Sequence, residues 1–281
     1  MLQERPCTLL GSQRNYAYSE NPGPPILFLH GVTRRWQCFQ PILPAFVHAW
    51  KTFALDFRGH GLSDRADSGY RVIDYVPDAV EFIRTTIGEP TIVYGHSLGS
   101  MVAAAVASEI PELVTAVILE DPPFDTMGNR IRQTALLVYF SELRRWASCG
   151  RSISEVATEL AEIRMQTPGE PDAVRLGDVR DAAWFRFAAK SLLKLDPAAL
   201  EPIAQARWLE DFDWRAILSR IACPALLLEA EMSAGGMLTP DAAQEAERLI
   251  PDCTRVKFDC HHLIHWYRTR ELTNAVLNFL G

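Results

Sequence analysis

The chain has 281 residues, of which 48% are hydrophobic and 22% charged, as in an ordinary globular protein with one core and room for an insertion. Its 28 Lys and Arg against 35 Asp and Glu give a formal net charge of −7, a balance that excludes the basic footprint of a nucleic-acid-binding protein. No apolar run reaches the roughly 18 residues of a membrane-spanning helix, and the first residues lack the pattern of a secretory signal.

The first third of the chain begins an alternation of strand-like runs and helical patterns. Residues 25–29 form a continuous apolar run, typical of a buried central strand, and residues 51–56 predict the next strand. Between them, residues 36–50 carry apolar residues at helical spacing, although Pro41 and Pro44 leave the ends of that helix open.

The alternation continues with a helix at residues 75–87, a strand at 91–94, a buried helix at 98–110 and a strand at 114–120. A last strand–helix–strand–helix unit follows at residues 224–230, 242–249, 255–259 and 271–280. This order predicts an α/β fold with a mostly parallel central β-sheet flanked by helices.

Residues 124–214 interrupt the alternation. They contain almost no strand-like run but several amphipathic helical patterns, such as residues 153–163 and 182–195. We interpret them as an inserted helical cap over the C-terminal edge of the sheet, with residues 1–123 and 215–281 as the core. The aromatic residues of the cap either face a hydrophobic ligand or pack the cap onto the core: Tyr139, Trp146, Trp184, Phe185 and Phe187.

The sharpest motif is Gly95-His96-Ser97-Leu98-Gly99, which matches G-x-S-x-G between a predicted strand and a predicted helix. Small residues two positions before and two after Ser97 allow a tight turn that lifts the hydroxyl out of the sheet edge. The serine also lies at the positive end of the following helix, which favours developing negative charge. We therefore predict Ser97 as a nucleophile and His96 as a residue of its pocket or a structural residue.

A serine hydroxyl needs a general base within hydrogen-bonding reach. His262 follows the last predicted strand and precedes the C-terminal helix, which places it on a late loop at the same sheet edge as Ser97. Its neighbour His261 is the main rival, because a shift of one residue would exchange the two, and His265 is interpreted as structural or pocket-lining.

The acid that orients the base is less certain from the residues alone. Asp121 directly follows the strand after the nucleophile helix, and we favour it. Glu231, after the penultimate strand, is the next candidate, and Glu120 is a third whose register differs by one residue.

Two backbone N–H groups are predicted to hold the oxyanion. Leu98 N–H follows the serine at the helix N-terminus, and Val32 N–H follows His30-Gly31 at the end of the first central strand. The next residues of that loop either line the pocket or form a solvated turn: Arg34, Arg35 and Trp36.

Together these motifs resemble the α/β-hydrolase superfamily over nearly the whole chain outside the insertion. His30-Gly31 resembles its oxyanion loop, residues 56–63 its D-x-R-G-x-G-x-S turn and residues 95–99 its nucleophile elbow. Residues 262–266 resemble the late G-H-x-x-x-W stretch of its single-cap members, although His261 stands where glycine is usual. The resemblance implies a single-cap serine hydrolase of the esterase or lactonase type. Members often carry the acid as G-x-x-D after the penultimate strand, where this chain has Ser233 in place of Asp. Haloalkane dehalogenases and a lactone-hydrolysing branch place it one strand earlier, at the position of Asp121.

The predicted activity is hydrolysis of a small hydrophobic carboxylic ester or lactone through an acyl-enzyme. The alternatives are a C–C bond hydrolase or a cofactor-free perhydrolase on the same fold, or a non-catalytic ligand-binding protein. Six scattered cysteines without metal-ligand spacing indicate reduced thiols in a cytoplasmic protein with no metal. We also expect no organic cofactor, no nucleic-acid or membrane partner, and a monomer or homodimer.

Overall fold

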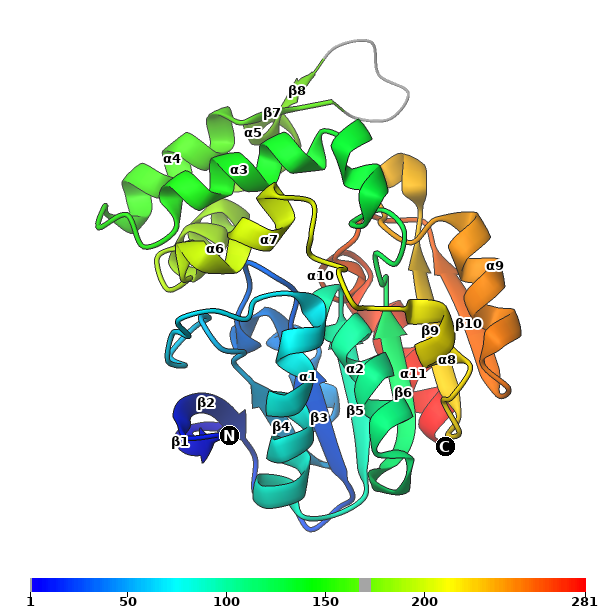
Figure 1. Cartoon of the computed structure of the whole chain (residues 1–281). Helices are drawn as coiled ribbons and strands as arrows, with labels where there is room; N and C mark the ends of the chain where they lie inside the picture. Colours follow the sequence, from blue (N-terminus) through cyan, green and yellow to red (C-terminus); the bar gives the residue numbers. More distant parts are fainter. Residues whose placement is uncertain (1, 167–172) are drawn as a thin grey trace.

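An eight-stranded sheet forms the centre of the computed structural model, which describes residues 2–166 and 173–281 (Figure 1). The strand order is β1-β2-β4-β3-β5-β6-β9-β10, and all neighbours from β4 to β10 are parallel. The strands are β1 (Gln3–Leu9), β2 (Ser12–Tyr18), β3 (Pro25–Leu29), β4 (Lys51–Leu55), β5 (Thr91–His96), β6 (Val114–Glu120), β9 (Ala225–Ala230) and β10 (Cys253–Phe258). The predicted mostly parallel sheet is confirmed.

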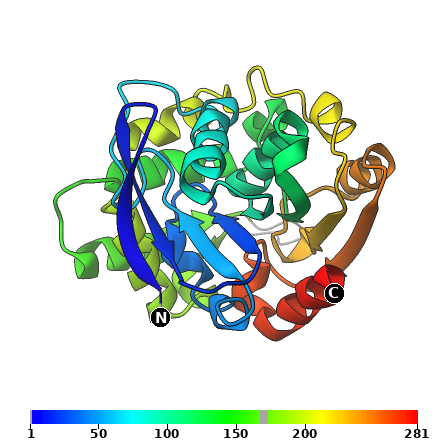
Figure 2. The same cartoon turned by 90° about the horizontal axis from the view of Figure 1, so that it is seen from below.

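Helices cover both faces of the sheet (Figure 2). One face carries α1 (Val72–Glu81), α2 (Leu98–Glu109), α8 (Trp214–Leu218) and α9 (Pro240–Leu249), and the other carries α10 (Ile264–Tyr267) and α11 (Thr269–Leu280). Side chains alternate along each strand, so Leu27 and Leu29 join the first hydrophobic cluster while Ile26 and Phe28 join the second. The two clusters hold the strand ends in place from both sides.

The N-terminal hairpin was not predicted. β1 and β2 pair antiparallel with each other, and β2 pairs antiparallel with β4. Most side chains of β1 are exposed and polar or charged, so this edge strand shows no apolar alternation from which to identify it.

Two predicted helices have different bounds in the structure. Residues 36–50 form two short 3₁₀ helices, Trp36–Phe39 and Leu43–Ala45, instead of one α-helix. The two prolines of this segment lack the N–H that a continuous helix needs. The helix expected at residues 75–87 begins earlier, as α1, and its last turns, Phe82–Ile87, are π-helical.

The segment between β6 and α8, called the inserted segment below, lies beyond the C-terminal ends of the parallel strands (Figure 1). It contains α3 (Leu136–Trp146), α4 (Ile153–Glu162), α5 (Leu176–Val179), α6 (Ala182–Leu192) and α7 (Glu201–Ala204), with a short hairpin of β7 (Arg164–Met165) and β8 (Val174–Arg175). The helices expected near residues 153–163 and 182–195 are confirmed as α4 and α6. Residues 167–172 of the predicted cap lie outside the described residues. None of the helices within residues 2–166 and 173–281 has the length and apolar character needed to cross a bilayer.

Candidate active site

Ser97 occupies a sharp turn between β5 and α2, with backbone angles φ 55° and ψ −114°. A Cβ at Gly95 would lie 2.1 Å from the carbonyl oxygen of Gly99, and a Cβ at Gly99 would lie 1.8 Å from that of Leu29. Both positions therefore require glycine, as the motif predicts. The strained φ of Ser97, which non-glycine residues rarely adopt, is held by the strand and the helix on either side.

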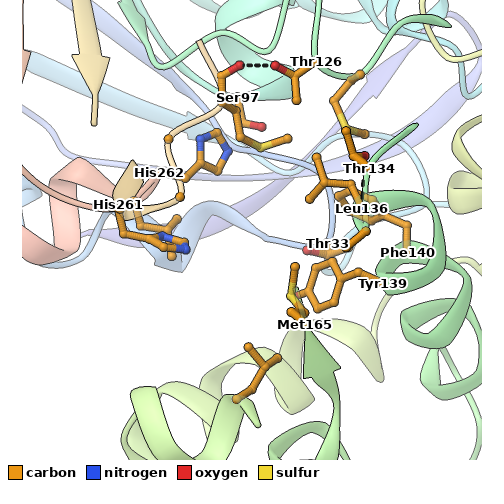
Figure 3. Close-up of a pocket in the computed structure, with 18 of the residues that line it drawn as sticks. Thr33, Ser97, Thr126, Thr134, Leu136, Tyr139, Phe140, Met165, His261 and His262 are labelled. Atoms are coloured by element: carbon orange, nitrogen blue, oxygen red, sulfur yellow. Dashed lines mark hydrogen bonds between the residues drawn. The ribbon is translucent and has the colours of Figure 1, made fainter. Parts of the chain in front are cut away.

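Asp121 follows β6 in a left-handed conformation (φ 44°), and its side chain is fully buried. Its carboxylate accepts three backbone hydrogen bonds, from Met237 N at 2.8 Å and from Leu238 N and Ala230 N at 3.2 Å. It also accepts a 2.6 Å hydrogen bond from His262 Nδ1. With Nδ1 bound in this way, Nε2 is the nitrogen of His262 that remains for the cavity, which Ser97 also lines (Figure 3).

Glu231 does not reach His262. Its carboxylate lies 2.9 Å from the ammonium of Lys257 and accepts hydrogen bonds from the backbone N–H and the hydroxyl of Ser233. The hydrogen bond from Lys257 lowers the pKa of the Glu231 carboxyl to about 2. Of the three acids considered from the sequence, the structure brings Asp121 to His262.

Glu120 forms a second, deeper network. One carboxylate oxygen accepts His265 N at 3.0 Å and His265 Nδ1 at 2.8 Å, and the other accepts the hydroxyl of Tyr94 at 2.5 Å. His96, whose ring lies 4.9 Å from that of His265, contacts the His262 carbonyl oxygen through Nε2 at 3.2 Å. Burial, with the neighbouring imidazoles, lowers the pKa of His96 well below its usual value, so the ring is neutral and its Nε2–H is the donor.

Ligand atoms of His96, Glu120 and His265 lie within 4.8 Å of one another, which makes them the group to consider for a metal ion. Both oxygens of Glu120 already accept hydrogen bonds, and only His96 Nδ1 and His265 Nε2 are without a partner. Two imidazole nitrogens fall short of the four ligands of a typical protein zinc site. The three residues therefore form a hydrogen-bonded network, and His96 supports the loop of His262 through the contact with its carbonyl oxygen.

Hydrogen bonds of the His30 side chain hold the loop after β3 in place. His30 donates from Nδ1 to the Gly31 carbonyl oxygen at 2.8 Å and accepts the Phe57 N–H at Nε2, 3.1 Å away. A Cβ at Gly31 would lie 3.1 Å from Ser97 Cβ, so the backbone passes close to the serine only because residue 31 is glycine. Within the described residues, neither Val32 N–H nor Leu98 N–H donates to a protein acceptor, so both are free for a ligand.

Two predicted pocket residues lie elsewhere. Trp36 donates its backbone N–H to Asp56 at 2.8 Å and its indole N–H to Glu4 at 2.5 Å, and it is buried beneath the loop instead of lining the cavity. Phe185 is buried in α6, with its ring edge-on to Trp184 at 5.1 Å, and it too is absent from the lining. The structure thus places these two side chains in the packing of the loop and of α6.

The cavity has a volume of about 600 Å³ and lies between the sheet edge and the inserted segment. Figure 3 shows Ser97, His261 and His262 on one side, and Tyr139, Phe140 and Met165 on the other. Trp184 and His96 are among its lining residues. Two further lining residues, Arg180 and Thr126, were not predicted from the sequence. The polar residues around Arg180 are typical of a solvent-exposed segment, so they did not indicate a pocket. Thr126 donates its hydroxyl to the Met237 carbonyl oxygen at 2.6 Å.

Comparisons with known proteins agree with this architecture. The sequence model of the alpha/beta hydrolase fold family matches residues 24–150. A 2-(acetamidomethylene)succinate hydrolase of Mesorhizobium japonicum is 39% identical over 99 residues, which are 35% of this chain and 36% of that protein. The chain thus aligns with little more than a third of this relative's length.

Two further similarities extend over nearly the whole chain. An sn-1-specific diacylglycerol lipase, ABHD11, of Xenopus tropicalis is 26% identical over 271 residues, covering 92% of this chain and 78% of the lipase. The crystal structure of an E-2-(acetamidomethylene)succinate hydrolase superposes with a TM-score of 0.75 at 24% identity, covering 100% of this chain and 99% of that one. At this identity the superposition demonstrates the shared fold.

Proposed function

The chain belongs to the α/β-hydrolase superfamily, and on this premise we propose that it is a serine hydrolase that cleaves a carboxylic ester or lactone through an acyl-enzyme. Ser97 is the nucleophile, His262 the general base and Asp121 the acid. The observation that carries the proposal is the 2.6 Å hydrogen bond from His262 Nδ1 to Asp121, in a cavity that Ser97 also lines.

Acylation begins when Ser97 Oγ attacks the substrate carbonyl carbon and its proton passes to His262 Nε2. The imidazolium that forms is stabilised by the Asp121 carboxylate, which already accepts the Nδ1–H. Because Asp121 is held by three backbone N–H groups, it keeps the imidazole in the productive tautomer without rearranging. His262 then gives its proton to the leaving alkoxide, and the C–O bond breaks.

The carbonyl oxygen, negatively charged in the tetrahedral intermediate, accepts hydrogen bonds from Val32 N–H and Leu98 N–H. Leu98 is the first residue of α2, so the positive end of the helix dipole adds to the stabilisation. Deacylation repeats these steps with a water molecule, which His262 deprotonates for attack on the acyl carbon.

The names of the relatives support hydrolysis, and the substrates that they name differ in charge. The frog relative is described as a diacylglycerol lipase, whose substrate is a neutral ester. The rhizobial relative is described as acting on a substituted succinate, which carries carboxylates. C–C bond hydrolysis and perhydrolysis would use the same serine and histidine, so substrate turnover has to separate them from ester cleavage.

The test is reaction of the purified protein with a fluorophosphonate probe and turnover of a short p-nitrophenyl ester. Ser97→Ala should abolish labelling, and Ser97→Ala or His262→Ala should lower kcat by at least about 10⁴-fold. Ser108→Ala is the matched control, because Ser108 lies on the same helix and contacts Arg220 instead of the cavity. A wild-type protein that neither labels at Ser97 nor turns over any ester or lactone would contradict the proposal and favour a ligand-binding role.

A further inference from the structure

The charges that line the cavity are of one sign. Among the described lining residues, the formally charged side chains are Arg34 and Arg180, and none is Asp or Glu. The chain as a whole has a net charge of −7. The described lining therefore carries two positive charges and no carboxylate, which is the reverse of the overall charge balance and favours an anionic group of a ligand.

Arg34 follows the oxyanion loop and is partly buried. Its guanidinium lies 5.3 Å from the ring centre of Trp184, and it forms no ion pair with any described residue. Its neighbour Arg35 points elsewhere, over the ring of Phe187, and does not line the cavity. Arg34 thus lines the cavity without an ion-pair or hydrogen-bond partner for its guanidinium among residues 2–166 and 173–281.

Arg180 reaches the same cavity from the inserted segment, just after α5. Its guanidinium lies 5.5 Å from the Tyr267 ring and makes one hydrogen bond, to the Val179 carbonyl oxygen at 2.9 Å. The adjacent Asp181 is exposed, and its carboxylate accepts the Trp184 N–H at the start of α6 at 2.8 Å. No carboxylate within the described residues forms an ion pair with Arg180.

Arg180 lies over the ring of Tyr267, whose centre is 5.7 Å from that of His261, and the charges of both arginines act on His261. Burial lowers the pKa of His261 well below its usual value, and the nearby charges of Arg180 and Arg34 lower it further. The same two charges act on Tyr139 and Tyr267. His261 Nδ1 is itself buried without a hydrogen-bond partner. Within the described part of the chain, the two arginines and an unpartnered nitrogen therefore act around His261, and the exposed Asp181 is the carboxylate that acts on the neighbouring Tyr267.

We propose that Arg34 and Arg180 bind a carboxylate of the substrate, so that the preferred substrate is an ester or lactone whose acyl part ends in a carboxylate. A guanidinium presents paired donors that match a carboxylate. The apolar walls formed by Leu136, Phe140 and Met165 suit the carbon chain between the ester and the carboxylate of such a substrate. The proposal rests on the proposed serine hydrolase function and specifies its substrate class.

The experiment compares p-nitrophenyl hexanoate with mono-p-nitrophenyl adipate, whose acyl chains have equal length and differ in a terminal methyl or carboxylate. A second pair, octanoate and suberate, varies the distance between the ester and the charge. We expect at least one carboxylate ester to exceed its neutral partner in kcat/KM by about 10-fold or more. Arg34→Gln and Arg180→Gln should each lower that ratio by about 10-fold, and Arg34→Lys should restore part of it.

Arg35→Gln is the matched control, since it removes the same charge from the same loop outside the cavity and should leave the ratio at its wild-type value. Because each ratio is measured within one variant, partial unfolding cancels. If both kinds of ester are cleaved but the neutral ester is preferred at both lengths, or the ratio survives Arg34→Gln and Arg180→Gln, the carboxylate site is wrong while the serine hydrolase stands.

A binding measurement separates this failure from failure of the proposed function. Ser97→Ala is titrated calorimetrically with monomethyl adipate and with methyl hexanoate. Tighter binding of monomethyl adipate, lost in Ser97→Ala combined with Arg34→Gln, supports the carboxylate site even if the wild-type protein cleaves neither ester. Equal or absent binding of the two ligands overturns it.

Discussion

Two consecutive acids at the end of β6 each pair with a histidine of the segment after β10, and the two pairs differ in their surroundings. Asp121 binds His262 at 2.6 Å, and the His262 side chain is 13% exposed and lines the cavity. Glu120 binds His265 at 2.8 Å, and both of these side chains are 0% exposed. The same chemical pair thus occurs once at the cavity and once inside the protein.

The backbone explains the separation. Successive strand residues point to opposite faces, and Asp121 turns further away because its φ is positive. Glu120 therefore points towards Tyr94 and the buried imidazoles, while Asp121 points towards His262. Access to the cavity, and not the presence of a histidine–carboxylate pair, distinguishes a candidate base from a structural contact.

Among changes to the two acids and their neighbours, the largest effect is expected from Asp121→Asn. The amide removes the charge that stabilises the imidazolium and disfavours the required tautomer of His262, so kcat should fall by about 10⁴-fold. The measurement is kcat with a p-nitrophenyl ester, together with the rate of fluorophosphonate labelling. Circular dichroism of the variant provides the control for folding, and a well-folded variant that retains a tenth of the wild-type kcat would contradict the assignment of Asp121.

Glu120→Ala should act on stability instead. It leaves His265 and Tyr94 without their buried partner, and removing one member of a buried pair typically lowers the free energy of unfolding by about 3–5 kcal/mol. Urea denaturation measures this loss. The kcat of the molecules that remain folded should change by less than about 10-fold, since the His262–Asp121 contact is intact. A larger fall in kcat at unchanged stability would mean that the two pairs have exchanged roles.

His96, between the two pairs, provides a pH test. The folded protein keeps this buried ring neutral, whereas the unfolded chain takes up a proton below its usual pKa of 6.5. The stabilising contribution is therefore present above pH 6.5 and is lost as the pH falls, by up to about 1.4 kcal/mol per pH unit. His96→Gln, which keeps a donor towards the His262 carbonyl oxygen, should make the free energy of unfolding fall less steeply with acid. Parallel curves for the two proteins would contradict a neutral His96.

How far the sequence predicts this site depends on whether local patterns encode each residue. The turn at Ser97 was predictable because the motif of Gly95, Ser97 and Gly99 is local in the sequence, although the contact that requires Gly99 comes from Leu29 in β3. The buried parallel strands were predictable from continuous apolar runs. Asp121 could be favoured over its rivals but not fixed, because its identity depends on which carboxylate meets a histidine 141 positions away.

The lining of the cavity was the least predictable part. Trp36 and Phe185 are large and apolar, which suits both a ligand site and a hydrophobic core, and the structure places them in the core. Arg180 resembles any surface arginine until the inserted segment folds over the sheet edge. Pocket residues are selected by tertiary packing, which the periodicity of a single segment does not encode.

The smallest effect is expected for Glu231→Gln, which sharpens the comparison because Glu231 is a rival acid after β9, two residues before Ser233, where many superfamily members carry theirs. Its carboxylate is committed to Lys257 at 2.9 Å and to Ser233, and it forms no hydrogen bond with His262. Exposed ion pairs of this kind contribute little, so kcat should stay within about twofold of wild type. Measured beside Asp121→Asn with the same ester, the two variants separate the candidate acids directly. A steep loss in Glu231→Gln would require the late loop to rearrange during catalysis, so that His262 exchanges Asp121 for Glu231.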